Sequence, residues 1–152
     1  MKKRSLVKKK RNLPHWTLGK SLYFVTFRAA STSFTDEERS IVLQHLREGE
    51  DKYYMLASFV VMPDHVHLLI KPLPPYELSR IMKGIKGVFA RKVNLHRNSK
   101  GKIWQDESWD RIVRDEDEFH EKLTYIANNP VKNELVKQIE DYPFWYYNAE
   151  FG

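Results

Sequence analysis

The chain has 152 residues, of which 41% are hydrophobic and 30% are charged, so its length and composition suit one soluble globular domain. It contains no cysteine, which excludes disulfides, iron–sulfur clusters, thiolate zinc sites and cysteine nucleophiles. No stretch approaches the roughly 20 apolar residues of a membrane span, and no apolar core follows the basic first residues. We therefore expect no membrane association and no secretory signal, and the cytoplasm is the expected compartment.

The net charge of +6 is distributed unevenly along the chain. Residues 1–20 carry eight lysines or arginines and no acid, and residues 71–102 carry nine basic side chains and one acid. Basic segments on an otherwise balanced domain favour a polyanion partner, usually nucleic acid, although a solvated tail and a solvated helix face give the same pattern. We expect residues 1–19 to form a flexible basic arm and residues 20–152 to form a single domain.

Hydrophobic periodicity predicts a mixture of strands and helices. In chain order these are a strand at 21–29, a helix at 36–48, strands at 53–62 and 65–71, a basic helix at 76–96, one or two short strands within 103–114, and a helix from 115 to 128 or 129. Thr35 is the predicted N-cap of the first helix, and Pro130 is predicted to end the last one. This order is typical of an α+β, ferredoxin-like antiparallel sheet with helices packed on it and an extra C-terminal helix. We expect the aromatic tail to close the core or to pack onto the sheet.

His65 and His67 are two residues apart on a predicted strand, so both imidazoles project from one face of the sheet. Such a pair supplies two nitrogen ligands for a metal and leaves positions open for substrate. Two polar residues on a solvated strand face would give the same sequence. The residues between and after the histidines point into the core, and we expect the histidine face to lie outside it. Asp64 fits a turn after Pro63 better than it fits a ligand.

Tyr125 and Asn129 are four residues apart on the last predicted helix, which places them on one face. A tyrosine hydroxyl, with a pKa of about 10, needs activation or positioning to act as a nucleophile at neutral pH. An asparagine carbonyl oxygen suits Mg²⁺ or Mn²⁺. A core tyrosine followed by an Asn-Asn-Pro helix end would explain the same residues without any chemistry.

Three segments together resemble a known family: VVMPDHVHLLIKP, KGIKGVFARKVN and IWQDESWDRIVRDEDEFHEKLTYIANNPVKNELV. The chain resembles the single-tyrosine HUH transposases, which are named for a His-hydrophobic-His motif. Within them it is most similar to the REP-associated tyrosine transposases, domesticated relatives that act on repetitive palindromic DNA. The likeness covers residues 20–147, and all the segments are in order.

The resemblance implies a Mg²⁺- or Mn²⁺-dependent endonuclease and strand transferase acting on single-stranded DNA with hairpin structure. Tyr125 matches the family's nucleophile, which forms a 5′-phosphotyrosine and leaves a free 3′-OH. His65 and His67 match its metal ligands. Asn129 falls where many insertion-sequence members carry glutamine, so the third ligand arm is shorter by one methylene. Insertion-sequence relatives resemble dimers that exchange the tyrosine helix, whereas the REP-associated branch resembles monomers, and we expect a monomer.

Further side chains are predicted to contact DNA. They are Lys83, Lys86, Arg91, Trp104, Gln105 and Arg111. The basic residues of the long helix would hold backbone phosphates, and Trp104 and Trp109 would either stack on unpaired bases or pack in the core. Gly84 and Gly87 weaken that helix, which indicates close approach of DNA or of another helix.

Two other functions remain open on the sequence alone. One is a phosphoesterase that uses the histidine pair to hydrolyse its substrate without a covalent step. The other is a DNA-binding regulator that has kept the fold without catalysis. A covalent protein–DNA adduct distinguishes the transferase from both.

Overall fold

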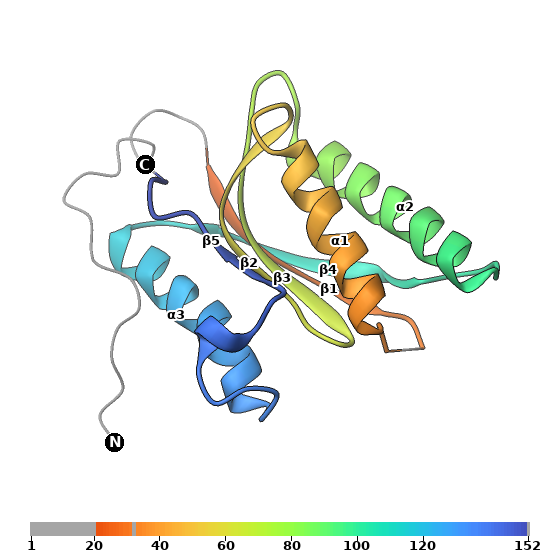
Figure 1. Ribbon diagram of the computed structural model, residues 1–152. Helices are drawn as coiled ribbons and strands as arrows, with labels where there is room; N and C mark the ends of the chain where they lie inside the picture. The colour runs from red at the N-terminus through yellow and green to blue at the C-terminus, as the bar shows by residue number, and fades with distance from the viewer. Residues whose placement is uncertain (1–20, 32, 152) are drawn as a thin grey trace.

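The computed structural model describes residues 21–31 and 33–151, which build a twisted sheet with helices on both faces (Figure 1). The predicted arm, residues 1–19, lies outside the described residues. In chain order the elements are β1 (Leu22–Ala29), α1 (Asp36–Gly49), β2 (Tyr54–Val61), β3 (His65–Pro72), α2 (Leu78–Arg97), β4 (Trp104–Val113), α3 (Glu116–Lys132), the short 3₁₀ helix η2 (Ile139–Asp141) and β5 (Trp145–Tyr147).

The strands form one antiparallel sheet in the order β4-β1-β3-β2-β5. With α1 and α2, the first four strands have the ferredoxin-like connectivity that the sequence predicts, and α3 is the extra C-terminal helix. Helices α1 and α2 lie side by side on one face, and α3 covers the other (Figure 1). The aromatic tail closes the core as expected, because β5 pairs with β2 and both Tyr142 and Phe144 are buried. No helix in the described part of the chain is long and apolar enough to cross a membrane.

All residues of β3 are buried, because this strand lies between β1 and β2 and has helices above and below it. Val66, Leu68 and Ile70 alternate with the histidines and point toward α1 and α2. The expectation that the histidine face lies outside the core is wrong, since His65 is 9% and His67 is 3% exposed beneath α3. The sequence could not show this, because the docking of α3 on that face is a long-range contact.

Two predicted element boundaries change. Residues 104–113 form one strand of ten residues, where the sequence predicts one or two short strands. Helix α3 does not end at Pro130 but continues to Lys132. Pro130 lies in the last turn, where Asn133 N–H donates to the Asn129 carbonyl at 3.1 Å and Leu135 N–H donates to the Pro130 carbonyl at 2.9 Å. The helix therefore loses only the hydrogen bond that the proline nitrogen cannot donate.

Glu38 ties the start of α1 to the end of α2. Its buried carboxylate accepts hydrogen bonds from Arg97 at 2.7 and 2.9 Å, lies 3.2 Å from His96 Nδ1, and accepts the Thr35 backbone N–H at 3.0 Å. The last of these belongs to the capping box that starts α1, as the Thr35 N-cap prediction requires. The hydrogen bonds from Arg97, and then from Thr35 and His96, outweigh desolvation and lower the pKa of Glu38 to about 2.

We expect Glu38→Gln to lower the free energy of unfolding near neutral pH by about 2 kcal/mol, because Arg97 and His96 lose the charge that they face. The folded pKa of Glu38 is depressed, so its contribution is present above about pH 4.5 and is lost as the pH falls toward 2. Urea unfolding of both proteins across this range measures the effect. Glu37→Gln, at an exposed neighbouring carboxylate, is the control and should change the free energy by less than about 0.5 kcal/mol. A constant difference between wild type and Glu38→Gln at every pH would contradict the assignment.

Candidate active site

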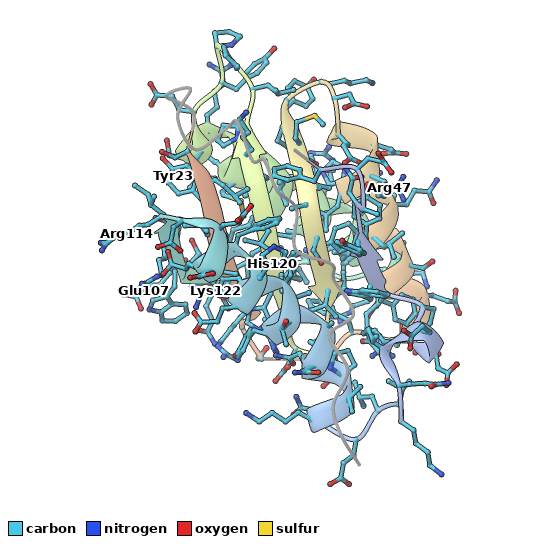
Figure 2. All side chains as sticks on the ribbon, turned by 90° about the vertical axis from the view of Figure 1, so that its left-hand side faces the viewer. Tyr23, Arg47, Glu107, Arg114, His120 and Lys122 are labelled. Atoms are coloured by element: carbon cyan, nitrogen blue, oxygen red, sulfur yellow. The ribbon has the colours of Figure 1, made fainter. Side chains whose placement is uncertain are left out.

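The face of the sheet beneath α3 gathers polar and aromatic side chains from β1 and β3. In the antiparallel pair, Thr26 lies opposite His67 and Arg28 lies opposite His65, so these side chains share one face. Phe24, two residues before Thr26, projects from the same face of β1. Figure 2 looks toward this side of the molecule from the direction of α3.

The Nδ1 atom of each histidine has a hydrogen-bond partner. His65 Nδ1 lies 2.7 Å from Asp64 Oδ1, and His67 Nδ1 lies 2.8 Å from Thr26 Oγ1. Asp64 therefore orients a histidine in addition to its predicted place in the turn. The Asp64 carboxylate accepts, so His65 Nδ1 donates and its Nε2 keeps its lone pair. The Thr26 hydroxyl can accept from or donate to His67 Nδ1, and a metal on His67 Nε2 requires the tautomer in which Nδ1 donates. His67 Nε2 is buried and has no hydrogen-bond partner among the described residues. An orphaned ring nitrogen with an anchored Nδ1 fits the metal ligand that the sequence predicts.

The charge state of His67 also suits ligation. Burial, followed by the positive charges of His65, Arg28 and Lys122, lowers the pKa of His67 to about 3. The ring is therefore neutral at physiological pH, which is the form in which imidazole binds metals. The two histidine rings lie together, with centroids 4.7 Å apart.

Tyr125 projects from α3 onto the histidine pair. Its ring centroid lies 5.2 Å from that of His67 and 5.9 Å from that of Phe24, and both contacts are edge-to-face. Phe24 stacks on His67 with centroids 5.5 Å apart, so it forms the floor between the histidine and the tyrosine. Tyr125 remains 46% exposed, which leaves its hydroxyl accessible to a nucleic acid strand.

Three other tyrosines, Tyr142, Tyr146 and Tyr23, lie away from the histidine pair or on the other face of the sheet. The Tyr142 hydroxyl donates to a carbonyl of β2 at 2.6 Å, and the Tyr146 hydroxyl donates to the Glu50 carboxylate at 3.2 Å. Burial raises the pKa of both hydroxyls. Tyr23 neighbours Phe24 on β1 and so projects from the opposite face of the sheet. These placements favour Tyr125.

Asn129 lies one turn after Tyr125 and is 7% exposed. Asn133 Nδ2 donates to the Asn129 side-chain oxygen at 3.2 Å and to its backbone carbonyl at 2.8 Å. An amide oxygen has two acceptor sites, so one remains for a cation. Within the described residues no three or more His, Asp or Glu side chains form a group that could hold a metal ion. An amide or a water would therefore have to complete a site on the histidines, and Asn129 as the third ligand stays a prediction.

Trp104 does not lie at the surface. It is 5% exposed, and its ring packs against those of Phe27, Phe34 and Phe89. Its assignment as a DNA contact is wrong, and the core alternative holds. A side chain buried against β1, α2 and the segment before α1 cannot reach an unpaired base.

Trp109 and Arg111, in contrast, lie on the same face as the histidines. Trp109 is opposite Thr26 on the neighbouring strand, and Arg111 is opposite Phe24. Trp109 is 53% exposed, so its ring can stack on a base. Arg111 forms an ion pair with Glu118 in the first turn of α3 at 2.6 Å, and this contact fixes that helix end to β4.

The predicted contacts on α2 lie on the other face of the sheet from the histidines (Figure 1). Lys83 and Arg91 are exposed there. A Cβ on Gly84 or Gly87 would meet no described atom within 4 Å, so the described residues hold no helix that approaches these glycines. The alternative, close approach of DNA, stays a prediction.

Lys86 and Gln105 connect the start of β4 to its neighbours. Lys86 Nζ donates to the Gln105 carbonyl at 3.1 Å, and Gln105 Nε2 donates to the Ala29 carbonyl at 3.2 Å. Gln105 also lines a polar pocket of about 360 Å³ beside the histidines, together with Arg28, Ala29, Ser31, Ser33 and Asp64. A larger hollow of about 570 Å³ lies between α1 and α2, on the opposite face. Of the two, the smaller pocket is lined by the neighbours of His65, because Asp64 is hydrogen-bonded to His65 and Arg28 lies opposite it on β1.

Comparison with known proteins decides the family. The profile of the transposase family described as IS200-like matches residues 22–129, from the start of β1 to Asn129. The chain belongs to this family. A relative of this chain, the REP-associated tyrosine transposase of Escherichia coli K12, is 29% identical over 106 residues, which are 68% of this chain and 61% of that protein. The matched part thus spans less than two thirds of the relative.

A solved structure shows the same fold. It is described as a REP-associated tyrosine transposase bound to a REP hairpin, and it matches with a TM-score of 0.67 and 22% identity, covering 82% of this chain and 75% of that one. The resemblance to REP-associated tyrosine transposases is therefore confirmed. The roles of individual residues in this chain stay predictions.

Proposed function

We propose that this protein is a metal-dependent endonuclease and strand transferase for single-stranded DNA, acting on hairpin or repetitive palindromic DNA through Tyr125. The observation that carries the proposal is the contact between the accessible Tyr125 ring and His67, whose buried Nε2 has no partner among the described residues. A tyrosine beside two anchored imidazoles combines a nucleophile with ligands for an electrophilic metal.

In the proposed reaction the half-exposed Tyr125 hydroxyl gives its proton to solvent water, and its oxygen attacks the scissile phosphorus. The bond from phosphorus to the 3′ oxygen breaks, and that oxygen takes up a proton to become a free 3′-OH. The other DNA end remains on Tyr125 as a 5′-phosphotyrosine, which a DNA 3′-OH can later displace without ATP. His65 and His67, with Asn129 or water, would hold Mg²⁺ or Mn²⁺, which polarises the phosphate and offsets charge on the leaving oxygen.

The partner we propose is single-stranded DNA with hairpin structure, bound by a monomer in the cytoplasm. Trp109 offers a stacking surface beside the site, and the basic face of α2 offers phosphate contacts. Residues 2–11 add seven positive charges that strengthen binding at low salt. The second candidate is a metal phosphoesterase without a covalent step, which the histidine pair supports because it could hold an ion that activates water.

A denaturing gel tests the proposal. A hairpin labelled at its 3′ end should migrate with the protein when Mg²⁺ or Mn²⁺ is present, and the same hairpin labelled at its 5′ end should give a shortened fragment with a free 3′-OH. Chelation of the metal should abolish both products. Shortened DNA without a labelled protein band would favour the phosphoesterase, and intact DNA in every metal would favour a DNA-binding regulator.

A further inference from the structure

Two cations flank the histidine pair on the side of the sheet that α3 covers. Arg28 lies on β1 opposite His65 and lines the polar pocket of about 360 Å³. Lys122 lies on α3, one turn before Tyr125, and its Nζ is 4.9 Å from the centre of the Phe24 ring. Figure 2 shows Lys122 on α3, on the side that faces the viewer.

Both cations act on the same centre. Arg28 lies opposite His65, whose ring contacts that of His67, and Lys122 lies over the Phe24 ring, which stacks on His67. Phe24, beneath Lys122, and Arg28 are four residues apart on one strand, which separates their backbones by about 13 Å. Thr26, with His67 opposite, lies midway between them. Along β1, Lys122 therefore lies at one end of the site and Arg28 at the other, with His67 and Tyr125 between them.

Neither cation has an ion-pair partner within residues 21–31 and 33–151, although both lie on a face that also carries acidic side chains. Arg28 is exposed, and Lys122 is half-buried against the aromatic floor of the site. Two unpaired positive charges on either side of a nucleophile match a ligand that carries regularly spaced negative charges. A single DNA strand carries one such charge per nucleotide.

We propose that the substrate strand crosses the site along β1, with Lys122 and Arg28 binding the phosphates on either side of the one that Tyr125 attacks. The pocket beside Arg28 then receives the nucleotide on that side, since its volume lies within the range of small-ligand sites. This strand path rests on the proposed function, because Tyr125 defines the position of the scissile phosphate.

Binding measured in the Tyr125→Phe background tests the path without cleavage. Lys122→Gln and Arg28→Gln should each weaken binding of the hairpin about tenfold and lower the salt dependence by about 0.7 in its logarithmic slope. Lys122→Arg, which keeps the charge, should retain most of the affinity. Lys137→Gln, which removes an exposed lysine outside the site, should change affinity less than about twofold.

A series of hairpins, each with one uncharged methylphosphonate linkage, assigns the contacts. One neutral linkage should eliminate the loss caused by Lys122→Gln, a different one should eliminate the loss caused by Arg28→Gln, and the two should lie on opposite sides of the cleaved linkage. If no linkage compensates either variant, or if both linkages lie on one side, the path is refuted even when the covalent adduct forms. A missing adduct in the wild-type protein refutes the nucleophile, whatever these binding measurements give. Thermal unfolding of each variant confirms that it is folded.

Discussion

Tyr125→Phe should abolish the covalent protein–DNA adduct and lower the rate of strand cleavage at least about 10³-fold, with folding and hairpin binding preserved. The change removes one oxygen from a half-exposed ring and leaves its edge-to-face contacts with His67 and Phe24 in place. The free energy of unfolding should therefore change by less than about 0.5 kcal/mol. The gel with 3′-labelled hairpin measures the adduct, and the 5′-labelled hairpin measures cleavage.

Tyr53→Phe is the matched control, because Tyr53 is 45% exposed and lines the hollow on the opposite face of the sheet. It should leave the adduct and the cleavage rate unchanged. Cleavage that persists without an adduct in Tyr125→Phe would support the phosphoesterase, with water as the nucleophile. An adduct that persists would place the nucleophile on another tyrosine and would refute the assignment of Tyr125.

The order and type of the elements follow from local patterns in the sequence. The β2–β3 hairpin, the Thr35 cap and the long basic helix each have short-range causes, and the structure agrees with them within one or two residues. The last turn of α3 was not predictable in this way, because a proline near a helix end removes few hydrogen bonds. The three-residue strand β5 forms only because β2 offers it an edge, so no local pattern could reveal it.

The site was predictable to the extent that it depends on spacing along one element. The separation of two between His65 and His67 gives their common face, and the resemblance singles out Tyr125. The residues that were missed, Phe24 and Thr26, come from another strand, and only the register of β1 on β3 places them beside His67. The register between two distant strands cannot be predicted from the sequence of either strand alone.

For Trp104 and Trp109, the alternation along a strand predicts that the two side chains lie on opposite faces, but it does not predict which face is buried. Their separation is odd, so on one continuous strand they project from opposite faces and only one can belong to the histidine face. A prediction of one or two short strands does not include this relation, because a break between two strands would change the alternation. Which face belongs to the core then depends on Phe27, Phe34 and Phe89, whose rings surround Trp104 in the fold.

Removal of the His67 ring should abolish metal binding and also weaken the fold. Because His67 is 3% exposed and stacks on Phe24, His67→Ala leaves a cavity and should lower the free energy of unfolding by about 1–2 kcal/mol. Wild-type protein in Mn²⁺ at about one hundred times the dissociation constant should gain about 2.7 kcal/mol of stability, whereas His67→Ala should gain none. Chemical unfolding with and without Mn²⁺ measures both effects without DNA.

Packing and metal ligation can be measured separately with His67→Leu, which refills most of the space but offers no lone pair to a metal. This variant should recover part of the lost stability in the absence of metal and should still gain nothing from Mn²⁺. His45→Gln, on α1 and beside the hollow of the opposite face, should keep the full gain. Cleavage should be lost in both His67 variants, since the attack by Tyr125 needs the scissile phosphate to be polarised. If His67→Leu keeps the Mn²⁺-dependent gain, the ion binds elsewhere, and the buried ring of His67 has a role in packing alone.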